Sequence, residues 1–476
     1  MANPKDAIKH IIVLMLENRS FDHMFGFMTV DQPRTPGDKI DNLKGDESNV
    51  DASGKDIAVS MDARYAGDFR ADPGHHFPDV TQQLFEKDEV ASTARPTMGG
   101  FVKNYGEQPG GSLVASRRVM KCFDPRKLPA LTALAKEFAV CDRWFSSVPG
   151  PTLPNRAFAH AATSLGHVDM SPIAYWNVMT LYERLDEAKA SSCVYSHDGN
   201  TLAFMFKTLF KKGGKFLGSY GDFLSDLRGN SLPKYCFVEP RFNDWYDAGN
   251  HRYYIANDQH PDNNLAEGEL LIQEVYQSIR KSKYWEKSLF VIVYDEHGGF
   301  FDHVKPPQTI PSGLEMPGVS TFDFARLGVR VPAVLISPYI EKGTIVHDQL
   351  EHSSLAATAR DILAPNMKTL SDRDKNANTF TSALTLMAPR DTPKTLDMEV
   401  DGADLRPTDV DPNTHGNATL SDQQRNQVLA AYMSDLDRPA GQRVIGKNGF
   451  LVLEDINTEQ KAAEYIKKVA KSMEIL

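Results

Sequence analysis

Three short apolar runs form the framework of the chain. They are "HIIVLMLEN" (residues 10–18), "LFVIVYDE" (residues 289–296) and "VPAVLISP" (residues 331–338). Apolar stretches of this length, without alternating polar positions, are typical of strands buried on both faces. The first two runs end in acidic or amide side chains, so polar chemistry is expected at the ends of these strands.

Helical periodicity lies beside these runs. Between Leu265 and Trp285, the side chains of Leu271, Val275 and Ile279 recur at a spacing of four, which places one apolar stripe on a helix. Residues 353–363, "SSLAATARDIL", open with serines that suit a helix N-terminus. Helices alternating with buried strands predict an α/β fold, with a mostly parallel central sheet and helices on both faces. Ligands of such sheets bind at the carboxyl ends of the strands.

The polar stretches predict how the chain is divided. Residues 29–100 are rich in Gly, Pro and Asp, and we interpret them as long loops or a lid. They belong to a catalytic domain expected over residues 1–370. Residues 371–476 predict a polar wrap that ends in helices and packs on the same domain.

Composition and charge narrow the classes of partner. The 476 residues include 53 Lys and Arg against 63 Asp and Glu, without a basic block, which argues against a nucleic-acid partner. The longest apolar runs are far shorter than the roughly 20 residues of a membrane span. The N-terminus lacks a basic region and a small-residue cleavage site, so we expect a cytoplasmic protein or the mature form of an exported one. Four cysteines without a CxxC pair predict buried thiols, with one disulfide as the alternative.

Oxygen-rich side chains follow two of the predicted strands. Glu17 and Asn18 end the first run, and Asp295 and Glu296 end the second, directly before a Gly-Gly pair that permits a tight turn. A carboxylate at the end of a buried strand is unfavourable unless it is paired or bound to a cation. Carboxylate and amide oxygens suit a hard divalent ion. The alternatives are a helix cap for the first pair and a solvated loop for the second.

A hydroxyl group stands in a proline-rich turn before another predicted helix. Thr152 lies between two prolines in "PGPTLPNRAFAHAATS" (residues 149–164), and the helix is expected to start near Asn155 and Arg156. A hydroxyl near a helix N-terminus faces free backbone N–H groups, which stabilise a phosphate or a developing oxyanion. The alternative is that Thr152 only caps this helix. His260 stands directly before the helix predicted at residues 265–285.

Together these segments resemble the phosphoesterase family of bacterial and plant phospholipases C and related acid phosphatases, in the alkaline-phosphatase-like superfamily. Matching stretches run in family order from residue 8 to about 363. Among them are "IKHIIVLMLENRSFDHMFG", "DPGHHFPDV", "VPGPTLPNRAFAHAATS", "VYSHDGNTL", "HPDNNLAEGELL", "VIVYDEHGGFFDHV" and "EHSSLAATARDIL". The resemblance implies an alkaline-phosphatase-like α/β fold with one catalytic centre at the strand ends.

The resemblance also implies roles for individual residues. The predicted ligands of a divalent cation are Glu17, Asn18, Thr152, Asp295 and Glu296. The hydroxyl of Thr152 is also the predicted nucleophile, and the predicted catalytic histidines are His75, His197, His260 and His352. Substrate binding is assigned to Asn155 and His303. For His303 and His352, a bracing role is the open alternative.

The function implied is a metal-dependent phosphoric ester hydrolase of the phospholipase C type. It would cleave a phosphodiester lipid to diacylglycerol and a phosphorylated head group through a phospho-threonine intermediate. An acid phosphatase acting on phosphomonoesters is the first alternative, and a non-catalytic binding protein of the same fold is a remote one. The cation could be Ca, Mg, Mn or Zn. Transient contact with a membrane surface stays open, although no amphipathic lipid-docking stretch is evident, and the sequence does not determine the oligomeric state.

Overall fold

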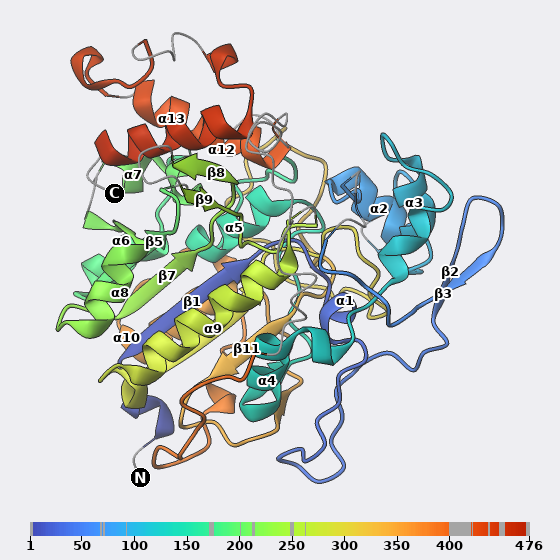
Figure 1. The fold of residues 1–476 in the computed structure, drawn as a ribbon, viewed down its shortest axis with the longest axis horizontal. Helices are drawn as coiled ribbons and strands as arrows, with labels where there is room; N and C mark the ends of the chain where they lie inside the picture. The colour runs from blue at the N-terminus through green and yellow to red at the C-terminus, as the bar shows by residue number, and fades with distance from the viewer. Residues whose placement is uncertain are drawn as a thin grey trace.

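An eight-stranded sheet forms the centre of the molecule, in the strand order β12-β4-β11-β10-β1-β7-β5-β6 (Figure 1). Its strands are β1 (His10–Leu16), β4 (Ala139–Cys141), β5 (Ser192–Ser196), β6 (Leu217–Ser219), β7 (Tyr235–Glu239), β10 (Ser288–Tyr294), β11 (Ala333–Ile336) and β12 (Thr344–Val346). Every residue of β10, and all of β1 except His10, is buried, as the apolar runs predicted.

The computed structural model describes residues 3–472, except 67–68, 70–71, 92, 171–175, 200, 212–214, 248–251, 262, 399–419, 421, 437 and 447–452. Much of the predicted C-terminal wrap therefore lies outside the described residues. Among the described residues, no helix combines the length and the apolar character needed to cross a membrane.

Most neighbouring strands of the sheet are parallel. Strand β1 pairs in parallel with β10 on one side and with β7 on the other, and the register places Leu16 opposite Tyr294. Strand β11 is antiparallel to both β10 and β4. The predicted α/β class with a mostly parallel sheet is confirmed, and the third apolar run supplies the antiparallel strand.

Helices pack on both faces of this sheet. Figure 1 shows α9 lying across the near face, while α10 lies behind the sheet. The helices of the catalytic region are α1 (Phe21–Phe25), α2 (Phe77–Phe85), α3 (Phe101–Glu107), α4 (Pro129–Glu137), α5 (Thr152–Ala161), α6 (Leu181–Glu187), α7 (Lys207–Lys211), α8 (Tyr220–Arg228), α9 (Leu265–Lys281) and α10 (Ser353–Leu363). Both helices predicted from periodicity are present. Helix α5 begins at Thr152, three residues before the predicted start.

Two smaller units flank the sheet. Helices α2 and α3 share an apolar cluster next to the hairpin of β2 (Ser48–Val50) and β3 (Asp56–Ala58). Beyond α11 (Asp372–Asn376), the helices α12 (Asp422–Leu436) and α13 (Glu459–Ser472) bury a cluster of their own, close to the hairpin of β8 (Trp245–Asp247) and β9 (Arg252–Tyr254). The division into a domain of residues 1–370 and a C-terminal part stays a prediction.

All four cysteines are free thiols, and three of them are buried.

Close packing fixes α9 against the segment that leads into it. A Cβ atom at Gly268 would overlap the side chain of Gln259. Gln259 is fully buried, and its amide donates to the carbonyl of Leu265 at 3.0 Å and accepts from the Tyr294 hydroxyl. Because Tyr294 is the last residue of β10, this contact sets how α9 sits over the strand.

We expect Gly268→Ala to destabilise the protein by about 1–3 kcal/mol, because the added methyl group displaces a buried, hydrogen-bonded amide. Gly221→Ala in α8 is the matched control, since the Cβ atom there would meet only Ser219 Oγ at 3.5 Å. That variant should gain up to about 1 kcal/mol, because alanine favours a helix over glycine. Urea unfolding of both variants measures the difference, and equal effects would contradict this packing.

Candidate active site

The carboxyl ends of β1 and β10 place the predicted metal ligands in neighbouring turns, although the carboxylate oxygens of Glu17, Asp295 and Glu296 do not all lie within 4.8 Å of one another. The backbone N–H of Asp295 donates to the carbonyl of Leu16 at 3.1 Å, which continues the parallel pairing for one residue. Asn18 then leaves the strand with a φ of 56°, and its N–H donates to Asp295 Oδ1 at 3.2 Å. Residues 17–18 and 295–296 therefore form one turn region at the end of the sheet, as predicted.

The Gly298-Gly299 pair lets this turn form. Gly298 has a φ of 64°, and a Cβ atom there would overlap the carbonyl of Asn18. The N–H of Gly298 donates to Glu296 Oε2 at 2.7 Å, which holds that carboxylate against the turn. A Cβ atom on Gly299 would come within 2.6 Å of the carbonyl of Gly74, so the segment before His75 packs directly on the pair.

Thr152 is the first residue of α5 and is buried beside Asn18. Its hydroxyl donates to Asn18 Oδ1 at 3.2 Å. Pro151, and not Thr152, is the N-cap residue of the helix, so the geometry does not support the capping alternative. The hydroxyl of Thr152 is instead directed toward Asn18 in the predicted metal-ligand turn.

Asn155 shapes the turn that precedes the hydroxyl. Its Oδ1 accepts from the N–H of Val148 at 2.9 Å, and its Nδ2 donates to the carbonyls of Val148, Gly150 and Pro151 at 3.1, 2.9 and 3.0 Å. These bonds occupy the amide, so the geometry gives Asn155 a positioning role. They do not support the predicted contact with substrate.

Arg156 is a central residue to which the sequence analysis gave no role. It lies one turn after Thr152 on α5, with its side chain fully buried. Its Nη2 lies 3.0 Å from Glu17 Oε1, its Nε donates to Asp295 Oδ2 at 2.9 Å, and its Nη1 lies 3.8 Å from Glu239 Oε1. A charged residue inside the apolar helix "LPNRAFAHAA" was the available signal.

The charges around Arg156 do not balance. Three fully buried carboxylates, those of Glu17, Glu239 and Asp295, surround the one guanidinium, and the carboxylate of Glu296 is buried next to Asp295 in the sequence. Burial raises the pKa of Asp295, and Arg156 only partly opposes this effect. Glu296 Oε1 is buried without a hydrogen-bond partner among the described residues. Buried carboxylates in excess are either protonated or balanced by a cation, and this oxygen-rich set fits a divalent ion.

His75 and His260 form the next group of predicted site residues. Asp72 Oδ2 lies 3.7 Å from His75 Nδ1 and 3.6 Å from His260 Nε2, and the two ring centroids are 6.3 Å apart. Burial lowers the pKa of His75, but Asp72 and Glu296 outweigh it and raise the pKa to about 9. Burial lowers the pKa of His260, and Asp72 only partly offsets this. The pair therefore combines a charged imidazole with a neutral one.

His352 contacts the turn that follows β10. Its Nε2 donates to the carbonyl of Asp295 at 2.6 Å, and its Nδ1 lies 3.4 Å from Trp144 Nε1. Burial lowers the pKa of His352 to about 4, so the ring is neutral near pH 7. Because both ring nitrogens are engaged within the protein, its contacts favour the bracing alternative.

His197 lies apart from the nucleophile in the described contacts. Its Nε2 accepts from Arg241 Nη2 at 2.9 Å, and its ring stacks on Tyr220 with centroids 4.2 Å apart. Burial and the Arg241 charge hold the pKa of His197 well below its usual value. Its predicted catalytic role is not supported by these partners and stays a prediction.

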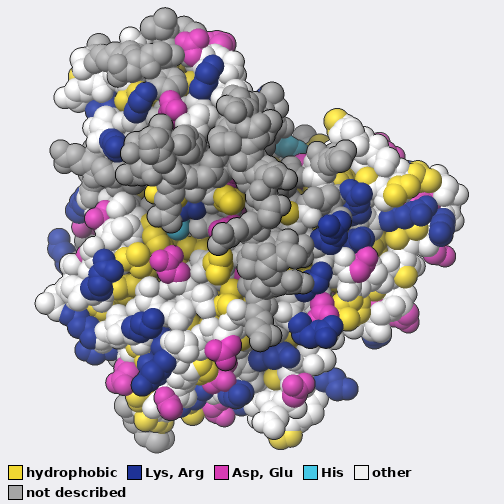
Figure 2. All heavy atoms as spheres, viewed as in Figure 1, with side chains coloured by type: hydrophobic (Ala, Val, Ile, Leu, Met, Phe, Trp, Pro, Cys, Tyr) yellow, Lys and Arg dark blue, Asp and Glu magenta, His cyan; other side chains and the backbone are white. Residues whose placement is uncertain are grey.

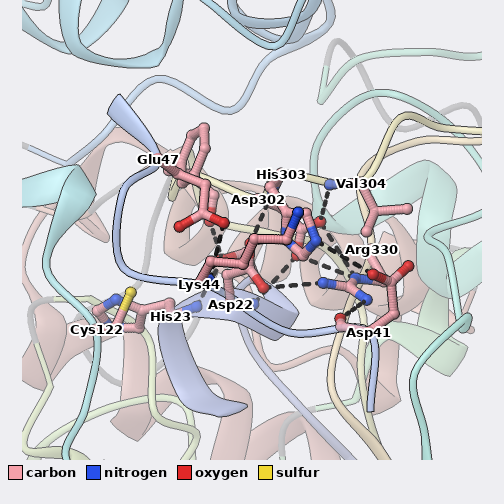
Figure 3. Close-up of polar contacts among 12 residues, drawn as sticks. Asp22, His23, Asp41, Lys44, Glu47, Cys122, Asp302, His303, Val304 and Arg330 are labelled. Atoms are coloured by element: carbon pink, nitrogen blue, oxygen red, sulfur yellow. Dashed lines mark hydrogen bonds and ion pairs between the residues drawn. The ribbon is translucent and has the colours of Figure 1, made fainter. Parts of the chain in front are cut away.

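His303 belongs to a separate ion-pair network, shown in Figure 3. Its Nδ1 lies 2.7 Å from Asp22 Oδ2, and its Nε2 lies 3.3 Å from Asp41 Oδ1. Burial lowers the pKa of His303, but the bonds to Asp22 and Asp41 outweigh it and raise the pKa to about 10. These contacts support the bracing alternative and not substrate binding.

Arg330 occupies the middle of the same network. Its Nη2 lies 2.9 Å from Asp22 Oδ1, and its Nε lies 3.2 Å from both oxygens of Asp302. Asp22, Asp302 and His303 form the only group of three or more His, Cys, Asp or Glu side chains, in the described part of the chain, whose ligand atoms lie within 4.8 Å of one another. Because a guanidinium already neutralises these acids, we assign this cluster to structure and not to a metal ion.

An α/β fold with buried carboxylates and a hydroxyl at its strand ends is an arrangement typical of hydrolases. The comparisons name the family: the chain belongs to the Phosphoesterase family, whose model matches residues 8–363. The predicted family and the predicted activity, hydrolysis of phosphate esters, are thereby confirmed.

Known proteins similar to the chain carry related names. Non-specific phospholipase C3 of Arabidopsis thaliana is 37% identical over 408 residues, which cover 82% of this chain and 76% of that protein. Phospholipase C B of Mycobacterium tuberculosis (strain ATCC 25618 / H37Rv) is 28% identical and covers 80% of this chain and 78% of its own length. A phosphonate monoester hydrolase of Agrobacterium radiobacter aligns over 54% of this chain and 72% of its own, with 12% identity and a TM-score of 0.33. That score is too low to carry an argument.

We expect Arg156→Met to destabilise the cation-free protein by about 3–5 kcal/mol, because it leaves buried carboxylates without their counter-charge. Arg156→Lys keeps a positive charge and should lose less. Urea unfolding in EDTA measures both values. A Met variant within 1 kcal/mol of the parent protein would contradict the charge argument.

The His303 network predicts a pH-dependent stability. A raised pKa in the folded state means that the stabilisation is complete below about pH 6.5 and is lost as the pH rises toward about 10. His303→Gln should therefore cost about 1–3 kcal/mol at pH 6, and the difference from the parent protein should shrink toward pH 10. Urea unfolding between these pH values tests this, and a difference that grows with pH would refute it.

Proposed function

We propose that the protein is a phospholipase C that hydrolyses a phosphodiester lipid to diacylglycerol and a phosphorylated head group. The observation that carries the proposal is the buried Thr152 hydroxyl bonded to Asn18, beside carboxylates that outnumber their one guanidinium. The phospholipase C names of the similar proteins support the choice of substrate class.

The proposed cation ligands are Glu17, Asn18, Thr152, Asp295 and Glu296. A divalent ion bound there would lower the pKa of the hydroxyl and offset the charge of the phosphoryl group. The fit rests on the unpartnered Glu296 Oε1, the excess of buried carboxylates and the absence of thiolate from the set. Oxygen donors favour Ca, Mg or Mn, with Zn as the alternative.

The residues around the hydroxyl have different proposed roles in the reaction. The Asn155 bonds hold the turn so that Thr152 faces the strand ends and attacks phosphorus, which forms a phospho-threonine. His75 and His260, on either side of Asp72, are proposed to bind phosphoryl oxygens and to protonate the departing alkoxide. Water then cleaves the phospho-threonine and restores the hydroxyl.

Thr152→Ala should lower turnover by at least about 10³-fold, because it removes the nucleophile and leaves the fold intact. Thr152→Ser is the matched control and should keep part of the activity, since it retains a hydroxyl. The assay compares phosphatidylcholine, glycerophosphocholine and p-nitrophenyl phosphate with metal-stripped enzyme and each cation restored in turn.

Each outcome of that assay is decisive. Hydrolysis of both diesters with a restored cation supports the proposal, and hydrolysis of the monoester alone would favour an acid phosphatase. Parent-like activity of Thr152→Ala would show that the nucleophile is another group.

A further inference from the structure

Glu239 is a buried carboxylate whose presence the fold alone does not explain. It is the last residue of β7, and its side chain is fully buried. Among the described residues, it is the one buried carboxylate of which neither oxygen has a hydrogen-bond partner. A carboxylate without hydrogen bonds is unfavourable in a protein interior unless a neighbouring charge compensates it. The groups around Glu239 therefore decide what it does.

Two side chains of α5 face this carboxylate. Glu239 Oε1 lies 3.8 Å from Arg156 Nη1 and 3.8 Å from His160 Nε2, which is longer than a hydrogen bond. Burial lowers the pKa of His160, so this ring is neutral near pH 7. Arg156 is thus the one permanent cation that the described part of the chain places within 4 Å of the Glu239 carboxylate.

Arg156 lies between Glu239 and two of the proposed cation ligands. Its Nη2 lies 3.0 Å from Glu17 Oε1 and its Nε donates to Asp295 Oδ2 at 2.9 Å, whereas its Nη1 faces Glu239 and makes no hydrogen bond. The charge of one guanidinium is therefore shared between two proposed ligands and a third carboxylate, which ends a different strand.

The interior position makes this third charge effective. On the face of the molecule shown in Figure 2, acidic and basic side chains are interspersed. Water and salt screen charges at such a surface over about 10 Å. The side chains of Glu239, Arg156 and Glu17 are fully buried, so the charges of these groups act on one another with much weaker screening.

We propose that Glu239 is a positioning residue that raises the cation affinity of the proposed active site by holding one side of the Arg156 guanidinium. This inference rests on the proposed function. A carboxylate at Nη1 leaves Glu17 and Asp295 less neutralised than they would be with Arg156 to themselves, and its own negative charge adds to the attraction for a cation. The excess of negative charge is unfavourable in the cation-free protein, and a bound divalent ion offsets it.

Glu239→Gln should weaken cation binding at least about tenfold, because it removes one buried negative charge and conserves the size of the side chain. In EDTA the same variant should be at least as stable as the parent protein, since a buried amide is less unfavourable than a carboxylate without hydrogen bonds. A purely structural role would instead lower the stability. Glu239→Asp retains the charge and should bind the cation more tightly than Glu239→Gln.

Isothermal titration calorimetry of the metal-stripped full chain at pH 8, with Ca²⁺, Mg²⁺, Mn²⁺ and Zn²⁺ in turn, measures the affinity. Urea unfolding in EDTA measures the stability. The matched control is Glu269→Gln on α9. Glu269 is also fully buried with one oxygen lacking a hydrogen-bond partner, and burial raises its pKa to about 7, so it is charged at pH 8. Its carboxylate accepts from the N–H groups of Ala130 and Leu131 at 2.7 and 3.2 Å, so the control should bind cations like the parent.

Three results would overturn this inference. They are parent-like cation affinity in Glu239→Gln, a loss of stability of that variant in EDTA, and an equal loss of affinity in Glu269→Gln. Failure of the proposed function looks different. A parent protein that binds none of the four cations contradicts both proposals, whereas one that binds a cation and hydrolyses no diester contradicts the proposed function alone.

Discussion

The guanidinium of Arg156 is a buried positive charge that joins α5 to the two central strands. Its contacts reach Glu17 after β1, Asp295 after β10 and Glu239 at the end of β7. It also donates to the carbonyl of Met15 at 3.2 Å. Because one rigid, planar group faces three carboxylates from different strands, the positions of the strand ends and of α5 are set together.

This arrangement links charge balance to the geometry of the reaction. Arg156 offsets part of the negative charge of the buried acids, and the remainder is the electrostatic reason to expect a bound cation. The same helix carries the hydroxyl one turn earlier, where it meets Asn18. A shift of α5 would therefore move the counter-charge and the proposed nucleophile, Thr152, at the same time.

The sequence was sufficient for the features that depend on local pattern. The buried runs of β1 and β10, the stripe of α9 and the Gly pair after Glu296 each have a signal within a few residues, and all are present. The antiparallel direction of β11 has no such signal, because a short apolar run has the same pattern in a parallel strand and in an antiparallel strand. The sequence also does not show that the side-chain amide of Asn155 is hydrogen-bonded within the turn that it stabilises.

Histidines were the hardest residues to assign from the sequence, for a physical reason. An imidazole looks the same in a motif whether its nitrogens face substrate or protein, and only the partners decide. His352 donates to the carbonyl of Asp295, so it holds the backbone of that turn. His303 lies between Asp22 and Asp41, so it holds these two carboxylates. His75 and His260 differ because they share one half-buried carboxylate, Asp72, at the edge of the cluster.

The segment from Asp72 to Phe77 thus connects the parts of the molecule that the proposed reaction needs. On its inner side, Gly74 packs on the Gly298-Gly299 turn, so the segment that carries His75 is held against the end of β10. On its outer side, the N–H of His76 donates to Asp79, which also accepts from Gln108 directly after α3. The position of His75 therefore depends on contacts with both the Gly298-Gly299 turn and the end of α3.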